Sequence, residues 1–256
     1  MSDRPDPVPR SNVQKQIEFY ERTARGFDRS IWSLGNRDNR NHHAKITAIA
    51  RALDIDAVGS LLEVGTGTGL HALRLMEGSR VRYVGLDVSS AMLETARGRL
   101  HGFRDRVQLA VADGSRVPFP DGTFDAAFCA GTLHHMADPS RGLRELVRVV
   151  RPGGRVAAME PNWKFPSVLA YTAMTRAEWN TFKISPARLE AWARASGLDE
   201  VRVRRLLYTP PRPRSWGKTW DAIDAGVART PVLRRLSIVL LVSGRVRLRG
   251  SAQVSS

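Results

Sequence analysis

A glycine-rich turn in the first half of the chain stands among three carboxylic acids. The apolar run LLEV carries Glu63 and enters the sequence GTGTG at residues 65–69. Such a turn lets a ligand approach the backbone, and the helix after it offers unpaired N–H groups. Asp87 follows the first of these glycines by twenty-two residues, a spacing that suits an acid bound to ribose hydroxyls. Asp113 closes the next apolar run. The pattern predicts a nucleoside site.

The turn lacks the features of phosphate-binding loops. The dinucleotide fingerprint needs glycine at its sixth position, where this chain has Leu70, and no Gly-Lys-Ser or Gly-Lys-Thr is present. Three clustered carboxylates would also repel a polyphosphate, because like charges in a partly desolvated pocket are costly. A nucleoside that carries positive charge fits this environment.

Two adjacent histidines follow a later apolar run. Either His134 or His135, with His135 slightly favoured, could be a base that deprotonates a hydroxyl or an activated carbon. A histidine that caps the next helix or packs on a cofactor would explain the pair as well. Cys129 is expected to be a small buried residue at a strand end. Neither this pair nor His42-His43 has metal-ligand spacing, so no metal is expected.

Alternating helices and strands must position these residues. Apolar stripes indicate helices at residues 42–53 and 143–150, the second of which ends at Arg151-Pro152-Gly153-Gly154. Ser185, with a proline after it, and Gly197 are typical of the two ends of a later helix. The expected strands are 60–64, 81–88, 107–112, 124–130, 155–159, 200–207 and 237–242. This order predicts one α/β domain, a doubly wound, Rossmann-like sheet of seven strands with helices on both faces. Ligands should bind at the carboxyl ends of its strands.

Length and composition agree with a globular protein. The 256 residues are 42% hydrophobic and 25% charged, and the longest apolar run, Leu236–Val242, is far shorter than the roughly 20 residues that cross a bilayer. A single cysteine and the lack of a secretory leader at the start favour the cytoplasm. The net charge is +15, of which residues 201–256 carry +10. Arginines there alternate with apolar residues, as on the solvent face of a strand, although they could also contact a polyanion.

Taken together, the motifs resemble those of class I S-adenosylmethionine-dependent methyltransferases, most closely the small-molecule and quinone-type group. The motifs are EVGTGTG, GLDVSSAML, VADGSRVPFPDGTFD, LHHMADP and LVRVVRPGG, and the likeness covers about residues 15–245. The resemblance implies the strand order 3-2-1-4-5-7-6, with the last strand antiparallel. It also implies S-adenosylmethionine as the cofactor, a nucleoside with a sulfonium and an ammonium group.

The same resemblance assigns residues to the cofactor. The glycine turn would line the methionine moiety, and Glu63 would orient its ammonium group, directly or through water. Asp87 would hold the ribose, Met92 would pack on adenine, and Asp113 would accept a hydrogen bond from the adenine amino group. The full expected set is Glu63, Gly65, Thr66, Gly67, Gly69, Asp87, Val88, Met92, Asp113, Gly114, Ala130 and Tyr20. On the alternative interpretation, the two aspartates merely cap the helices that follow them.

Two segments are expected to cover the site. Residues 1–40 would form an N-terminal lid or arm, and residues 41–256 the methyltransferase domain. Phe19-Tyr20 and Phe27-Asp28 resemble the aromatic lid of the family, but an amphipathic helix on the sheet edge would explain them equally. A cap insertion near residues 161–183 is rich in aromatic residues and methionine. These could form an apolar acceptor pocket or simply pack a helical cap.

The sequence therefore predicts a methyltransferase that modifies oxygen, carbon or nitrogen of a small apolar or aromatic acceptor. One alternative is a methyltransferase for nucleic acid or anionic lipid that uses the C-terminal arginines, which could also give peripheral membrane contact. Nucleic acid is disfavoured because the chain has no RNA-binding module or base-pocket motif, and Tyr208-Thr209-Pro210-Pro211 lies on the wrong element to replace one. Another alternative is a non-catalytic cofactor-binding module. The acceptor and the oligomeric state stay open.

Overall fold

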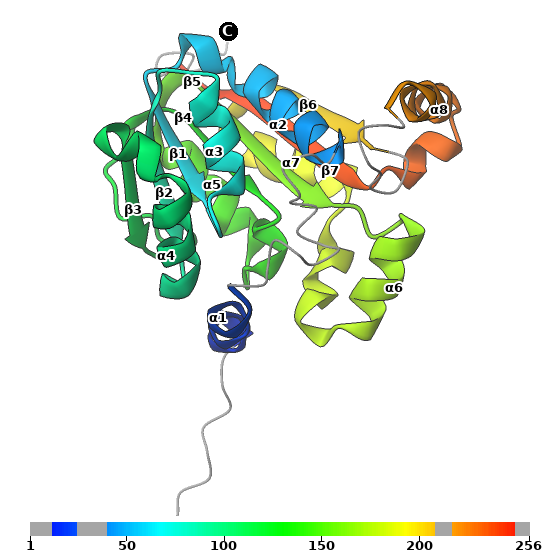
Figure 1. Cartoon of the computed structure of the whole chain (residues 1–256). Helices are drawn as coiled ribbons and strands as arrows, with labels where there is room; N and C mark the ends of the chain where they lie inside the picture. Colours follow the sequence, from blue (N-terminus) through cyan, green and yellow to red (C-terminus); the bar gives the residue numbers. More distant parts are fainter. Residues whose placement is uncertain (1–11, 25–39, 208–216, 249–256) are drawn as a thin grey trace, which may run out of the picture.

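One sheet forms the centre of the molecule in the computed structural model, which describes residues 12–24, 40–207 and 217–248. Its strand order is β3-β2-β1-β4-β5-β7-β6 (Figure 1). The strands are β1 (Ser60–Val64), β2 (Arg82–Asp87), β3 (Val107–Val111), β4 (Phe124–Ala130), β5 (Val150–Pro161), β6 (Leu198–Leu206) and β7 (Val239–Val246). All neighbours pair in parallel except β7, which is antiparallel to β5 and to β6. The predicted fold and strand order are confirmed.

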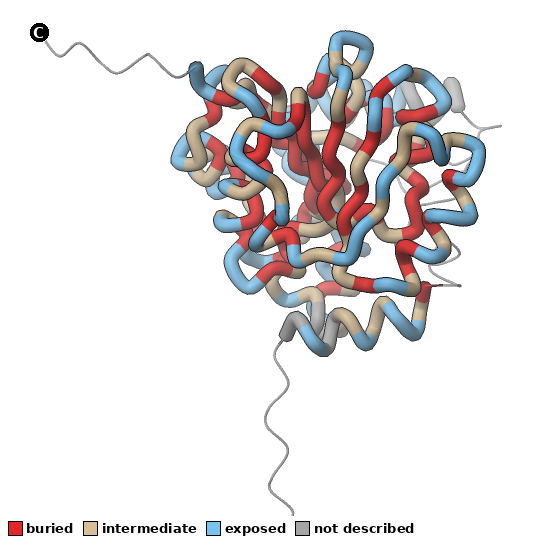
Figure 2. The backbone as a smooth tube through the Cα atoms, turned by 90° about the vertical axis from the view of Figure 1, so that its left-hand side faces the viewer, coloured by how far each residue is buried: buried red, intermediate tan, exposed pale blue. Residues whose placement is uncertain are grey.

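Helices cover both faces of the sheet. The α-helices are α1 (Asn12–Thr23), α2 (Arg40–Leu53), α3 (Leu70–Glu77), α4 (Ser90–Arg99), α5 (Pro139–Val149), α6 (Pro166–Met174), α7 (Pro186–Ala195) and α8 (Gly217–Arg229). Side chains alternate between faces along β1, so that Leu62 joins a core with α5 and α7, and Leu61 joins a core with α2 and α3. Figure 2 shows the buried strands between the two helical layers.

Short 3-10 helices complete the described chain. They are η2 (Ile55–Ala57), η3 (His101–Arg106), η4 (Leu133–His135), η5 (Arg176–Lys183) and η7 (Leu233–Leu236). Among the elements that the structure describes, no helix is long and apolar enough to cross a bilayer. Two of the short helices, η4 and η5, contribute to the site described below.

Local sequence signals explain most helix ends. Ser185 caps α7 by accepting a hydrogen bond from the backbone N–H of Arg188, and Gly197 beyond the helix has φ 96°. Several boundaries differ from the prediction by a few residues, and the start of β5 differs most, because the strand begins at Val150 and includes the Pro-Gly-Gly segment at which the preceding helix was expected to end. The pairing of β4 with β5 changes register here, and a side chain at Gly154 would collide with the backbone of Asp125. Glycine therefore permits a close strand contact at an irregularity.

Three elements gather at the carboxyl end of the parallel strands. Figure 1 shows α1 across that end of the sheet, with α6 on the same side of the molecule. The segment of α6 and η5 follows β5 directly and includes the predicted cap insertion. These elements are well placed to cover a ligand there.

Candidate active site

A pocket of about 260 Å³ opens at the carboxyl ends of β1, β2, β3 and β4. It contains most of the residues that the sequence predicts for the site: Tyr20, Gly65, Thr66, Gly67, Asp87, Val88, Met92, Asp113, Gly114, Ala130 and His135. The other three, Glu63, Gly69 and His134, are not among its lining residues. Residues that are more than 100 positions apart in the chain thus meet at one place.

The glycine turn forms one wall of the pocket. Gly65 and Gly67 have φ values of 77° and 54°, in the left-handed region that glycine adopts readily. A side chain at Gly65 would collide with Thr132, whereas one at Gly67 would meet no atom within 4 Å. The first glycine therefore permits close packing of two loops, and the second presents bare backbone to open space.

Asp87 is bound to the glycine turn itself. Its Oδ2 accepts a hydrogen bond from the N–H of Gly67 at 2.8 Å, and its Oδ1 accepts one from the N–H of Ser89 at 2.9 Å. Burial raises the pKa of Asp87 above its usual value, although these N–H groups oppose the shift. The N-cap of α4 is Ser89, which accepts from the N–H of Met92. The helix-capping interpretation of Asp87 is therefore wrong.

Asp113 occupies the corresponding position after β3. Its Oδ1 accepts a hydrogen bond from the N–H of Ser115 at 2.8 Å, and its side chain is exposed at the pocket wall. The next regular element in the described chain is the strand β4, so Asp113 caps no helix. That alternative is wrong for this residue too.

Glu63 lies behind the turn instead of in the pocket. It is fully buried on the face of the sheet toward α2 and α3. The hydroxyl of Tyr83 donates to its Oε2 at 2.5 Å, and Nδ1 of His71 lies 3.3 Å from its Oε1. His71 itself lines the pocket. Sequence reasoning missed both partners, since nothing near them in the chain marks them as neighbours of Glu63.

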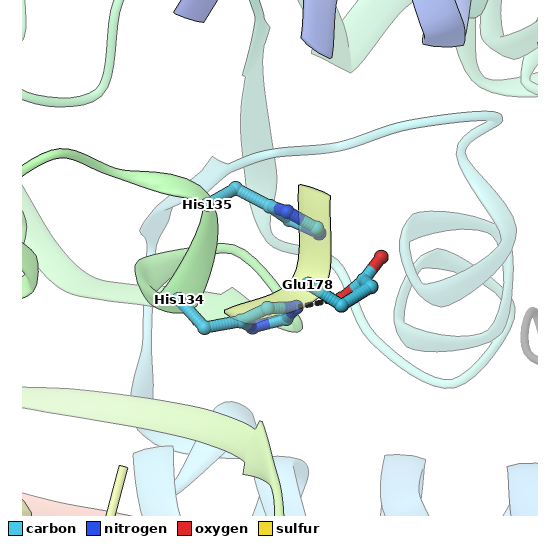
Figure 3. A group of neighbouring side chains, drawn as sticks. All are labelled: His134, His135 and Glu178. Carbon is cyan, nitrogen blue, oxygen red and sulfur yellow. Dashed lines mark ion pairs between the residues drawn. The ribbon is translucent and has the colours of Figure 1, made fainter. Parts of the chain in front are cut away.

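The rings of the two predicted histidines lie side by side near Glu178, with centroids 3.9 Å apart (Figure 3), but their other partners differ. His135 lines the pocket, and its Nε2 lies 2.7 Å from the hydroxyl of Tyr20 on α1. His134 is buried between two carboxylates, with Nδ1 2.6 Å from Glu160 and Nε2 3.2 Å from Glu178. Only His135 is therefore placed to meet an acceptor, and His134 is a buried structural partner.

Glu160 fixes the loop that carries these histidines. It is fully buried and accepts backbone hydrogen bonds from Thr132 at 3.1 Å, Leu133 at 2.9 Å and His134 at 3.3 Å. Sequence reasoning missed it, although it directly follows the expected strand 155–159. The rule that located the other carboxylates at strand ends could have found it.

The paired carboxylates separate the pKa values of the two histidines. Burial lowers the pKa of His134, but Glu160 and Glu178 outweigh it and raise the pKa to about 9. Burial and the charge of His134 lower the pKa of His135 to about 3. At neutral pH His134 is an imidazolium and His135 a neutral imidazole.

The same group of side chains has the spacing of a metal site. Ligand atoms of His134, His135 and Glu178 lie within 4.8 Å of one another and could hold a metal ion. In this structure Nε2 of His134 lies 3.2 Å from Glu178, and Nε2 of His135 lies 2.7 Å from the hydroxyl of Tyr20.

Helix α1 closes over the pocket through polar contacts. Besides the Tyr20 contact, Oε1 of Glu21 accepts hydrogen bonds from the hydroxyl of Ser90 and the N–H of Ala91, both at 3.3 Å. Burial and the charge of Glu178 raise the pKa of Tyr20 well above its usual value, so its phenol stays neutral. The helix thus lies across the strand ends and not on the sheet edge as in the alternative prediction (Figures 1 and 2). Phe27-Asp28 falls outside the described residues.

The aromatic and methionine residues of the 161–183 insertion do not line the pocket, and two of them face solvent. No residue of the 161–183 insertion is among the lining residues of the pocket. Met174 is 86% exposed and Trp179 is 50% exposed, while Phe182 packs edge-on against Trp163. Composition does not reveal which side of a short helix faces inward. The cap instead contributes Glu178, which sequence reasoning missed.

Part of the chain is similar in sequence to known methyltransferases. Residues 62–158 match the family described as "Methyltransferase domain". This match over residues 62–158 agrees with the expected class I S-adenosylmethionine-dependent methyltransferase family. The chain is 36% identical over 111 residues to 27-O-demethylrifamycin SV methyltransferase of Amycolatopsis mediterranei. The aligned residues cover 43% of this chain and 41% of the relative. The chain is 39% identical over 144 residues to demethylmenaquinone methyltransferase of Clavibacter sepedonicus, 56% of each chain. The matched part of the chain thus spans about half the length of these relatives.

Solved structures share the fold of the methyltransferase domain. Phosphoethanolamine N-methyltransferase 2 of Haemonchus contortus, in complex with S-adenosyl-L-methionine, matches 96% of this chain and 62% of its own with a TM-score of 0.70 and 17% identity. The [4+2]-cyclase SpnF matches 94% of this chain and 98% of its own, with a TM-score of 0.62 and 21% identity. Because one of these neighbours is named for cyclisation, the fold by itself does not define the reaction.

Proposed function

We propose that this protein transfers the methyl group of S-adenosylmethionine to a small acceptor in the pocket at the carboxyl ends of β1 to β4. The carrying observation is the pocket itself, in which Asp87 and Asp113 flank a glycine turn and a neutral histidine faces the same space. The two relatives named above are, by their names, methyltransferases for a rifamycin and a menaquinone precursor. Both are small molecules, which supports a small acceptor here.

The residues present fit S-adenosylmethionine. Bare backbone at Gly67 leaves space for its methionine moiety, and the carboxylates of Asp87 and Asp113 can accept hydrogen bonds from ribose hydroxyls and an adenine amino group. His71, backed by Glu63, adds a polar group on the same wall. When bound, the cofactor supplies an electrophilic methyl group.

The protein's own contribution is alignment and proton handling. Methyl transfer is an in-line displacement, so the site must hold the acceptor in place and exclude water. His134 is fixed by Glu160 and Glu178, and burial together with the positive charge of His134 keeps His135 neutral. A base of such low pKa removes only a readily lost proton. This favours an acceptor with an acidic proton, such as an aromatic hydroxyl or an activated ring carbon.

We infer that residues 1–40 act as the lid of this site and that residues 41–256 form the catalytic domain with its cap. The contact of Tyr20 with His135 and those of Glu21 with α4 support a lid, since they hold α1 across the pocket mouth. The cap supports the site from behind through Glu178.

Incubation with methyl-labelled S-adenosylmethionine and a panel of phenols, quinols and aliphatic alcohols tests this function. We expect label on phenols or quinols, with little effect of added salt. Tight cofactor binding without transfer to any acceptor, in the panel or in a cell extract, would instead indicate a non-catalytic module. A steep loss of activity with salt would indicate a polyanionic acceptor.

A further inference from the structure

A second hollow lies away from the active site, on the half of the sheet formed by β5, β7 and β6. This groove has a volume of about 340 Å³ and shares no lining residue with the pocket. Its charged lining consists of five arginines and one carboxylate: Arg51, Arg155, Arg202, Arg204, Arg245 and Glu200. We call it the arginine groove.

Strand register brings the arginines to one face. Arg155 on β5 is the direct partner of Arg245 on β7, and Arg202 on β6 is the partner of Ser243 two positions away. Because side chains alternate along a strand, these residues share the side of the sheet on which α2 packs. Arg51 joins them from the last turn of α2. Four elements therefore converge on the groove.

The positive charges of the groove are poorly balanced. The nearest carboxylate oxygens lie 3.8 Å from Arg245, on Glu200, and 3.8 Å from Arg155, on Asp54, which is longer than a hydrogen bond. Within the described ranges, Arg51, Arg202 and Arg204 form no ion pair. The Nε of Arg245 is buried and has no hydrogen-bond partner. Like charges on directly opposed strand positions are destabilising, so this arrangement has a cost.

Some arginines of the described chain outside the groove are paired closely, including one in the same strand as Arg155. Arg148 reaches Glu145 at 2.8 Å and Asp121 at 2.9 Å. Arg151 lies 2.6 Å from Asp125, in the same strand as Arg155. On a basic strand face that is merely solvated, guanidinium groups need not cluster. In the arginine groove, guanidinium groups from three neighbouring strands lie together, and the carboxylates near them are distant.

We propose that the arginine groove binds a phosphate-bearing anion. Guanidinium groups bind phosphate oxygens with paired, charge-assisted hydrogen bonds. The volume is in the range of small-molecule sites, which suits an organic phosphate or a lipid headgroup better than a polymer that would need a longer basic track. Glu200 at the lining would also repel a continuous polyanion. The site is distinct from that of the cofactor and does not depend on the proposed methyl transfer.

The test is calorimetric titration of the full chain with tripolyphosphate at fixed ionic strength near 0.15 M. We expect saturable binding at one site. The double variant Arg202→Gln/Arg204→Gln should weaken it at least about tenfold, since both residues lie on the exposed strand surface. The matched control Arg97→Gln/Arg104→Gln removes the same charge from exposed positions outside the groove and should change the affinity less than about twofold. Unchanged affinity for S-adenosylmethionine in both variants would show that they are folded.

Two further arms distinguish the source of the phosphate. If the protein sediments with phosphatidic acid vesicles and tripolyphosphate releases it from them, the ligand is a lipid headgroup. If the protein binds tripolyphosphate but does not sediment with the vesicles, the ligand is a free organic phosphate. Failure of tripolyphosphate to bind would overturn the proposal. Equal weakening of tripolyphosphate binding in the two double variants would also overturn it, because the effect would then reflect net charge only. The same holds if the protein binds a DNA duplex more tightly than tripolyphosphate and both double variants weaken that binding equally.

Discussion

The pocket and the arginine groove treat charge in opposite ways. In and behind the pocket, each buried charged group has a defined partner, such as Glu160 on His134 or Asp87 on the N–H of Gly67. In the groove, guanidinium groups cluster with carboxylates no nearer than 3.8 Å. Buried charges must be paired because an unpaired one is costly, whereas partly exposed charges can stay unpaired in solvent. The charged groups of the pocket are thus paired before a ligand binds, whereas the guanidinium groups of the groove would be paired by a bound ligand.

The largest expected effect comes from removing the buried acid. Glu160→Ala leaves His134 and three backbone N–H groups without their acceptor. We expect it to lower the free energy of unfolding in urea by about 3–5 kcal/mol. The control Glu190→Ala breaks an exposed pair with Arg194 and should cost less than about 1 kcal/mol. Similar small losses in both would contradict the organising role of Glu160.

Stability should also fall with rising pH because of His134. Its folded pKa of about 9 exceeds the unfolded value of about 6.5, so its contribution is complete below pH 6.5 and is lost toward pH 9. Between pH 6.5 and 8 we expect a loss of about 2 kcal/mol relative to His134→Gln. Above pH 8 the lowered pKa of buried Lys45, about 8, adds a change of opposite sign. Parallel pH profiles of the two proteins in urea unfolding would refute the assignment.

Cofactor affinity tests the front wall of the pocket. Asp87→Ala should weaken binding of S-adenosylmethionine by about 1–3 kcal/mol, because ribose hydroxyls would lose their acceptor. Asp105→Ala, which alters a side chain that is 97% exposed, is the control and should have no effect. Unchanged affinity of Asp87→Ala in calorimetry would remove Asp87 from the site.

The smallest effect is expected at the lid. Tyr20→Phe removes the hydroxyl that contacts His135 but keeps the ring. The loss of about 1 kcal/mol for one hydrogen bond corresponds to a fall of about fivefold in kcat/KM. Thr23→Val, which removes a hydroxyl bonded within α1, should leave kcat/KM unchanged. Equal activity of Tyr20→Phe and the wild type would mean that this contact does not serve catalysis.

Sequence reasoning reached the residues whose chemistry is tied to strand ends. The apolar runs located all seven strands, and the glycine turn located Asp87 and Asp113 on the pocket wall. It missed His71 and Tyr83, the partners of Glu63, because they come from other elements and carry no local signal. It missed Glu178 for the same reason, since η5 is irregular and its neighbour His134 is 44 positions away. Burial and pairing across such distances decide which of two adjacent histidines faces the pocket.

The central claim is that the pocket accepts a nucleoside bearing positive charge, and calorimetric titration tests it most directly. The full chain should bind S-adenosylmethionine and its demethylated product, and should show no measurable heat with a pyridine dinucleotide. Binding of the dinucleotide with no response to either of the first two compounds would contradict the account.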